Sequence, residues 1–91
     1  MLLTIDVGNT NTVLGLYDKE KLVNNWRTKT DANSTADELI LTFKGLLKDQ
    51  PEVTGISLCS TVPAVLREMR WMLERYFPKV KTVIIEPGTK T

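Results

Sequence analysis

The hydrophobic pattern of the first thirty residues predicts three strands joined by short turns. Residues 2–7, LLTIDV, are a short apolar run rich in branched side chains, as in a buried strand. Residues 12–17, TVLGLY, form a second run, and the pair Gly8-Asn9 between the runs favours a tight hairpin turn, because glycine accepts the positive φ that such turns require. Residues 22–28, LVNNWRT, alternate as a third strand does. The chain therefore opens on an antiparallel meander.

A first helix is predicted after the polar residues 29–35. Thr35 and Glu38 stand at capping-box spacing, which marks a helix start. The helix should close near residues 49–51, because the residue before a proline is disfavoured in a helix. Apolar residues at helical spacing predict one buried face, made of Leu39, Phe43, Leu46 and Leu47.

A second helix is predicted to begin at Pro63, since proline is tolerated in the first turn, and to stop before Pro78. Its inner face is predicted to consist of Val65, Leu66, Met69, Leu73 and either Tyr76 or Phe77.

Two further strands complete the pattern, at residues 53–59 and 82–85, with a turn at residues 86–88. The order is then β-β-β-α-β-α-β. Strands joined through a helix are expected to run parallel with a right-handed crossover. The sequence therefore predicts a single α/β domain over residues 1–91, with a mixed five-stranded sheet.

The composition is that of an ordinary globular domain, with 42% hydrophobic and 25% charged residues among 91. A net charge of +1 gives no bulk electrostatic case for binding nucleic acid or an anionic membrane. No apolar run approaches the ~18 residues that cross a bilayer, so we expect a cytoplasmic protein. Because histidine is absent, histidine-activated nucleophiles and histidine-ligated zinc are excluded.

Several reactive or aromatic side chains have a structural interpretation. Cys59 lies in a predicted strand, which indicates a buried, inert thiol. Trp26 and Trp71 lack flanking basic clusters, which indicates packing in a core or an interface instead of stacking on bases. Lys90 fits either a contact with a bound anion or a frayed terminus. Five charged residues of the second helix are interpreted as a solvated face: Arg67, Glu68, Arg70, Glu74 and Arg75.

The most polar part of the meander is its first turn, DVGNTNT, at residues 6–12. A plain hairpin turn explains every residue in it, because aspartate, asparagine and glycine all favour turns. The alternative is a phosphate-binding loop, in which a glycine leaves backbone N–H groups accessible among hydroxyl and amide side chains. Asp6, at the end of a buried strand, offers oxygen ligands for Mg²⁺ beside such phosphates.

An Asp-x-Gly-x-Thr loop between the first two strands of this frame resembles the first phosphate loop of the actin and sugar-kinase ATPase superfamily, whose fold is ribonuclease-H-like. The chain more narrowly resembles type III pantothenate kinase. The resemblance rests on an ordered set of motifs: DVGNTNTVLGLYD from residue 6, WRT at 26–28, TADE at 35–38, STVP at 60–63 and PGTKT at 87–91.

The resemblance implies ATP-dependent phosphorylation of pantothenate to 4′-phosphopantothenate, the first step of coenzyme A synthesis. It implies Mg²⁺ linked to Asp6, a monovalent cation (K⁺ or NH₄⁺), and a homodimer. It also implies that the ATP phosphates are held by Asp6, Val7, Gly8, Asn9, Thr10, Asn11, Thr12 and Val13.

The resemblance also implies that this chain is the N-terminal ATP-binding domain of a two-domain protein. The family's general base is an aspartate in a Gly-Ala-Asp-Arg motif, which these 91 residues lack. Phosphoryl transfer requires alignment of both reactants. We therefore expect no catalytic residue in the chain, no activity by itself, and weak nucleotide binding without the second domain, which would also hold pantothenate.

Two other functions remain open at this point. Members of the family are also called Bvg accessory factors, a name that implies a non-enzymatic transcriptional role. The absence of a basic patch argues against direct DNA binding. The other alternative is a structural half-domain without a ligand.

Overall fold

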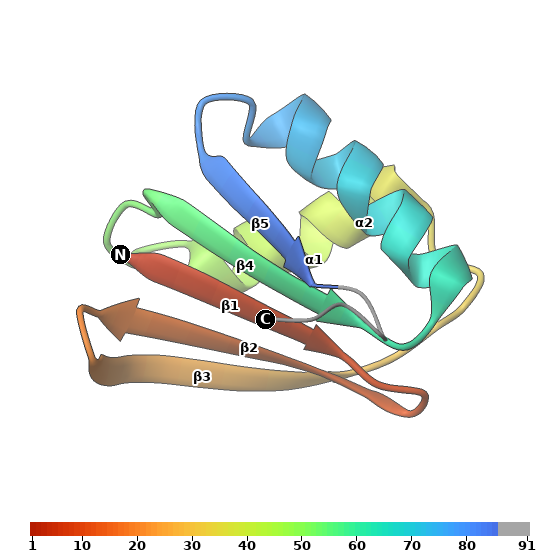
Figure 1. Cartoon of the computed structure of the whole chain (residues 1–91), viewed down its shortest axis with the longest axis horizontal. Helices are drawn as coiled ribbons and strands as arrows, with labels where there is room; N and C mark the ends of the chain where they lie inside the picture. Colours follow the sequence, from red (N-terminus) through yellow and green to blue (C-terminus); the bar gives the residue numbers. More distant parts are fainter. Residues whose placement is uncertain (86–91) are drawn as a thin grey trace.

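The computed structural model describes residues 1–85 as five strands and two helices in the predicted order (Figure 1). The elements are β1 (Leu2–Val7), β2 (Asn11–Asp18), β3 (Lys21–Lys29), α1 (Ala36–Leu47), β4 (Gly55–Ser60), α2 (Pro63–Tyr76) and β5 (Lys81–Ile85). The predicted turn at 86–88, the motif at 87–91 and Lys90 lie outside the described residues.

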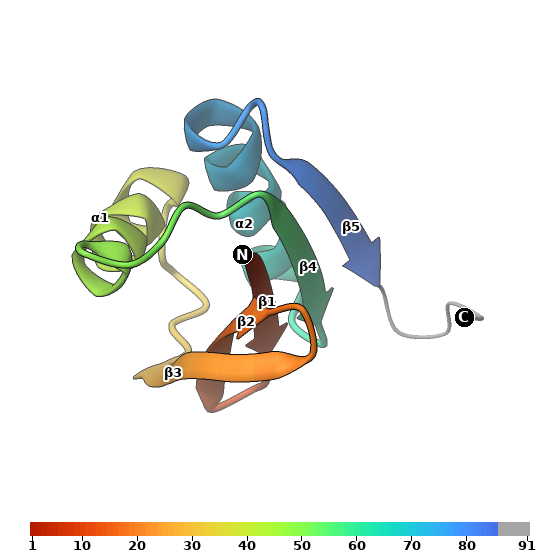
Figure 2. The same cartoon turned by 90° about the vertical axis from the view of Figure 1, so that its left-hand side faces the viewer.

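The strands form one mixed sheet in the order β3-β2-β1-β4-β5, which places β1 at its centre. The β1–β2 and β2–β3 pairs are antiparallel, whereas β1–β4 and β4–β5 are parallel. Both helices lie against the same face of the sheet (Figures 1 and 2). The predicted meander and the predicted parallel extension are therefore confirmed.

The strand ends differ slightly from the prediction. The second and third strands each extend one residue further at both ends than predicted. The fourth begins at Gly55 instead of residue 53, because Leu2, the first residue of β1, is already paired with Gly55. Thr54 instead donates its backbone N–H to the Met1 carbonyl at 2.8 Å.

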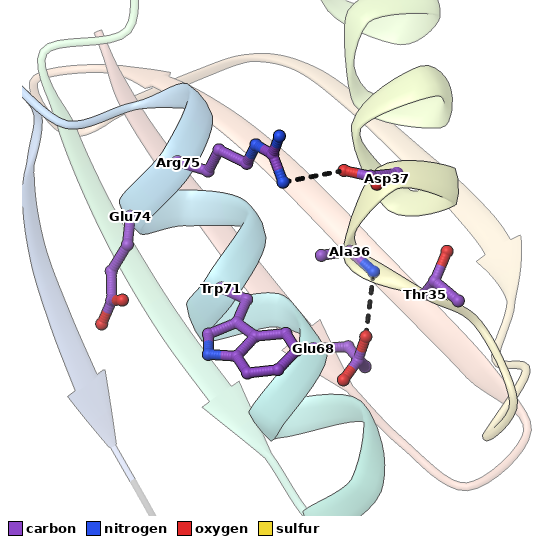
Figure 3. Close-up of a pocket in the computed structure, with 7 residues that line it drawn as sticks. All are labelled: Thr35, Ala36, Asp37, Glu68, Trp71, Glu74 and Arg75. Atoms are coloured by element: carbon purple, nitrogen blue, oxygen red, sulfur yellow. Dashed lines mark hydrogen bonds and ion pairs between the residues drawn. The ribbon is translucent and has the colours of Figure 1, made fainter.

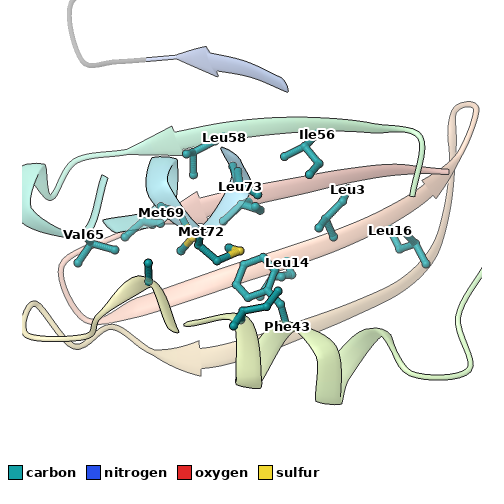
Figure 4. Packing of buried hydrophobic residues seen from close by; sticks show 14 residues of the cluster. Leu3, Leu14, Leu16, Phe43, Ile56, Leu58, Val65, Met69, Met72 and Leu73 are labelled. Atoms are coloured by element: carbon teal, nitrogen blue, oxygen red, sulfur yellow. The ribbon is translucent and has the colours of Figure 1, made fainter. Parts of the chain in front are cut away.

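The core lies between the sheet and the two helices, where the inward residues of β1, β2 and β4 meet the helix side chains (Figure 4). Phe43 is the largest fully buried side chain. The predicted inner faces are confirmed but incomplete. Leu39, Leu46, Leu47 and Leu66 pack against this core and are half-buried, while the buried Ala36, Ile40 and Met72 were missed. The most buried side of α1 runs through residues 36, 40 and 43. It is turned about the helix axis relative to the predicted side.

The opposite face of the sheet has no helix packed on it within residues 1–85 (Figure 2). Outward-facing residues of four strands leave apolar surface there: Leu2, Val13, Leu22 and Val83 are 39–51% exposed. No helix in that range is long and apolar enough to span a membrane.

The predicted capping box at the start of α1 is confirmed. The Glu38 N–H donates to Thr35 Oγ1 at 3.2 Å, and the Thr35 N–H donates to Glu38 Oε1 at 3.1 Å. Both bonds satisfy N–H groups that the helix itself leaves without partners.

Replacing Thr35 with Ala is therefore expected to lower the free energy of unfolding by about 1 kcal/mol. Urea denaturation followed by circular dichroism measures this. Ser34→Ala is the matched control, because the Ser34 hydroxyl makes no hydrogen bond with any described residue. An equal loss of stability in both variants would contradict the capping role.

Candidate functional site

The loop between β1 and β2 closes on one backbone hydrogen bond, from the Gly8 N–H to the Asn11 carbonyl at 2.9 Å. The turn therefore lies at Asn9-Thr10, and the predicted turn at Gly8-Asn9 is wrong. The predicted reason is also wrong, because Gly8 lies outside the left-handed φ range and neither Asn9 nor Thr10 has a positive φ. The hairpin itself is confirmed, with Val7 paired to Thr12.

Glycine at position 8 is favoured by close approach and not by a left-handed backbone. A Cβ atom at this position would lie 3.2 Å from the Asn11 carbonyl oxygen, tighter than an ordinary contact. A larger residue would need the Asn11 carbonyl, which accepts this hydrogen bond, to shift by a few tenths of an ångström. The glycine thus keeps the loop narrow.

The tip of the loop carries unused hydrogen-bond donors. Asn9 and Thr10 are exposed, and their backbone N–H groups donate to no acceptor among residues 1–85. The Asn11 side-chain amide donates to Thr10 Oγ1 at 3.2 Å, which fixes one side chain of the cluster. Adjacent free N–H groups in a turn form a concavity suited to an anion.

The predicted binding residues lie on both faces of the sheet. Asp6 and Val13 are cross-strand partners on the open face, and both are exposed. Val7 and Thr12 point into the core, with side chains 0% and 5% exposed. Val7 can therefore meet a ligand only through its backbone, whereas Asp6 can meet one with its carboxylate.

Asp6 lies near the carboxyl end of the central strand, next to Cys59 on the parallel strand β4. Ligands of α/β folds bind outside this end of the strands. No group of three or more potential metal-ligating side chains occurs in residues 1–85. A single carboxylate suits Mg²⁺ that takes its other ligands from water and phosphate oxygens.

Two connecting segments hold the loop from either side, and sequence reasoning missed this. Thr30, between β3 and α1, donates its N–H to the Thr10 carbonyl at 3.0 Å, and its hydroxyl lies 2.8 Å from the buried Thr12 hydroxyl. Thr61, after β4, donates its N–H to the Val7 carbonyl at 3.1 Å. The STVP motif contained the signal for Thr61, because it follows the strand beside β1.

A polar hollow of about 200 Å³ lies under this part of the loop, between β2, β3 and both helices. Thr12 and Thr30 line it together with Glu38 of α1, and Phe43 and Met69 contribute apolar wall. The start of β2 and the segment after β3 therefore border a hollow that both helices complete.

The other predicted roles had mixed outcomes. Cys59 is half-buried instead of buried. Trp26 is half-buried against the core, as predicted, but Trp71 is 61% exposed, so core packing is wrong for it. Its exposed indole cannot pack in the core because α2 turns it toward solvent.

The solvated-face interpretation of α2 is wrong for Glu68. Its carboxylate accepts the Ala36 N–H of α1 at 3.1 Å, and its side chain is 17% exposed (Figure 3). Glu68 thus satisfies an N–H group at the start of α1. Glu68 lines a groove of about 550 Å³ between α1 and α2, and this groove also contains the 3.9 Å Arg75–Asp37 ion pair. Asp37 also accepts the Tyr76 hydroxyl at 2.8 Å, and this hydrogen bond raises the Tyr76 pKa.

Comparison with known families gives a match over nearly the whole chain. The family model described as type III pantothenate kinase matches residues 2–91. Curated proteins named type III pantothenate kinase, from Parafrankia sp. (strain EAN1pec) and Salinispora arenicola (strain CNS-205), are each 60% identical to this chain. Each match covers 100% of this chain and 36% of the relative. The chain thus spans about a third of their length.

Solved structures share the fold at low sequence identity. A putative N-acetylmannosamine kinase from Listeria monocytogenes, Lmo2764, gives a TM-score of 0.65 at 17% identity, over 93% of this chain and 34% of that one. RuvC from Thermus thermophilus gives a TM-score of 0.53 at 19% identity, over 94% of this chain and 61% of that one. These likenesses show the fold alone, and they confirm the predicted ribonuclease-H-like α/β class.

Proposed function

This chain belongs to the type III pantothenate kinase family, and from that premise we propose that it forms the part of the kinase that binds the phosphates of ATP. The reaction of the whole protein would be phosphorylation of pantothenate to 4′-phosphopantothenate, the first step of coenzyme A synthesis. The family match favours this function over a transcriptional accessory role or a half-domain without a ligand.

The observation that carries the proposal is the pair of unused N–H groups at Asn9 and Thr10, on a loop at the carboxyl end of the central strand. These groups would bind phosphate oxygens without first breaking hydrogen bonds within the protein. Binding groups that are already oriented cost little reorganisation, which favours both affinity and charge stabilisation.

Asp6 would hold Mg²⁺, directly or through water, on the open face beside the loop. Its carboxylate is exposed and acceptor-only, and Mg²⁺ prefers such oxygen ligands next to phosphate. ATP would supply the phosphoryl group when bound; the loop N–H groups would position it, and Asp6 would hold the Mg²⁺ that offsets its charge. A monovalent cation, K⁺ or NH₄⁺, belongs to the same proposal as a family property.

The general base and the pantothenate site would come from the remaining two-thirds of the full-length protein, and the homodimer is likewise proposed for that form. The open sheet face supports this division, because Leu2 and Leu22, at the opposite end of the strands from Asp6, are exposed apolar side chains suited to contact with another domain. The 91-residue chain by itself is therefore proposed to be inactive and to bind nucleotide weakly.

Titration of the isotope-labelled chain with Mg-ATP tests the loop assignment. The amide resonances of residues 8–12 are expected to shift at millimolar ATP, while those of α1 and α2 remain in place. The shifts should shrink when Mg²⁺ is removed with a chelator. Resonances of the loop that stay unchanged at millimolar Mg-ATP would overturn the assignment.

A further inference from the structure

We propose that Thr30 is a positioning residue that holds the phosphate-binding loop in its binding geometry. The inference rests on the proposed function, since it concerns the same loop. Thr30 lies outside the Asp-x-Gly-x-Thr motif, more than fifteen residues further along the chain. It reaches the loop because β3 returns beside β2 and ends next to the place where β2 begins.

Two hydrogen bonds join Thr30 to the second half of the loop. Its backbone N–H donates to the Thr10 carbonyl at 3.0 Å. Its hydroxyl lies 2.8 Å from that of Thr12, which is 5% exposed. The bonds fall one on each side of Asn11, so Thr30 fixes the carbonyl at the loop tip and the first inward side chain of β2.

The first half of the loop is held separately. The Ser60 hydroxyl, 2% exposed, donates to the Val62 carbonyl at 3.1 Å and accepts the Val62 N–H at 3.0 Å. This local turn orients Thr61, whose N–H donates to the Val7 carbonyl at 3.1 Å. Thr61 therefore holds the first half of the loop from the β4 side, and Thr30 holds the second half from the β3 side.

The consequence concerns the free N–H groups of Asn9 and Thr10. The peptide unit from Thr10 to Asn11 is oriented by the Thr30 bond to its carbonyl, and the Thr10 N–H belongs to the preceding unit. Ordering a loop before the ligand arrives removes that entropic cost from binding. Without the Thr30 hydroxyl, the buried Thr12 hydroxyl loses its hydrogen-bond partner. The second half of the loop, residues 10–12, can then shift toward solvent.

Thr30→Val tests this with little change of side-chain shape, and Thr28→Val is the matched control. Thr28 also lines the hollow under the loop, but its hydroxyl has no hydrogen-bond partner among residues 1–85. A chimaera that joins residues 1–91 to the remaining two-thirds of the Parafrankia relative supplies the whole kinase. Its Kd for Mg-ATP is measured by calorimetry.

We expect Thr30→Val to raise this Kd about 5- to 10-fold, the equivalent of one lost hydrogen bond of about 1 kcal/mol. Thr30→Ser should restore binding, because it keeps the hydroxyl. In the 91-residue chain without ATP, hydrogen exchange at the amides of residues 8 and 30, which donate to the Asn11 and Thr10 carbonyls, should accelerate in Thr30→Val and stay unchanged in Thr28→Val. A merely structural role would not single out these two amides.

The outcomes separate this inference from the proposed function. If the unmodified chimaera binds Mg-ATP and Thr30→Val binds it equally well, the positioning role is overturned and the proposed function stands. If Thr30→Ser binds as poorly as Thr30→Val, the hydroxyl bond is not the cause and the role is again overturned. If the unmodified, folded chimaera does not bind Mg-ATP, both fall.

Discussion

Replacing Asp6 with Asn in the chimaera is expected to lower kcat/KM for ATP by about 100-fold or more. The change removes one negative charge, and with it the carboxylate proposed to hold Mg²⁺, while keeping the shape of the side chain. Metal-based charge stabilisation contributes several kcal/mol to such reactions, and each ~1.4 kcal/mol corresponds to a factor of ten in rate. Steady-state kinetics at fixed pantothenate and varied Mg-ATP measure the loss.

The location of Asp6 makes the comparison clean. The side chain is exposed on the open face, so Asn should leave the free energy of unfolding nearly unchanged. Asp18→Asn is the control, because Asp18 is also an exposed carboxylate and lies at the far end of β2. A variant at Asp6 that keeps the activity of the Asp18 variant would exclude Asp6 as the metal-linked carboxylate.

The order of elements could be predicted from the sequence because each element carries its own local signal. The capping box at Thr35 and the prolines at 63 and 78 define helix ends through backbone chemistry that needs no tertiary contact. The helix faces were less predictable. Ile40 and Met72 are buried because of how the helices lie on the sheet, and apolar spacing alone does not fix that rotation.

The loop shows the same limit at the candidate site. The polar residues and the glycine identified the loop from the sequence, but they did not give the position of the turn. The Gly8 N–H bonds to the Asn11 carbonyl, so the turn lies at Asn9-Thr10 and not at Gly8-Asn9. Thr30 could not be predicted either. Its link to Thr12 spans eighteen residues and exists only after β2 and β3 have paired.

Replacing Phe43 with Ala is expected to lower the free energy of unfolding by about 3–5 kcal/mol. The side chain is 2% exposed, and its removal leaves a cavity between the sheet and both helices. The total free energy of unfolding of a folded domain is about 5–15 kcal/mol. The variant should therefore lose a large share of its stability, with a melting temperature lower by more than about 12 °C.

Leu41→Ala is the control, because Leu41 lies two residues earlier in α1 and is 72% exposed. It should change stability by less than about 0.5 kcal/mol. Phe43→Leu keeps most of the apolar volume, so its urea midpoint should lie between those of Phe43→Ala and Leu41→Ala. It also provides a test if Phe43→Ala does not fold. Urea denaturation of the three variants ranks them, and equal midpoints would contradict the burial argument.

The Phe43 prediction also reaches the site, because the Phe43 side chain lines the hollow under Thr12 and Thr30. Emptying that wall removes apolar contacts from the surface on which the second half of the loop rests. In Phe43→Leu, which should remain folded, hydrogen exchange at the Gly8 and Thr30 amides is expected to rise, while the Thr61 amide stays protected. Uniform acceleration across the chain would instead indicate global loosening, and the hollow would then have no separate part in supporting the loop.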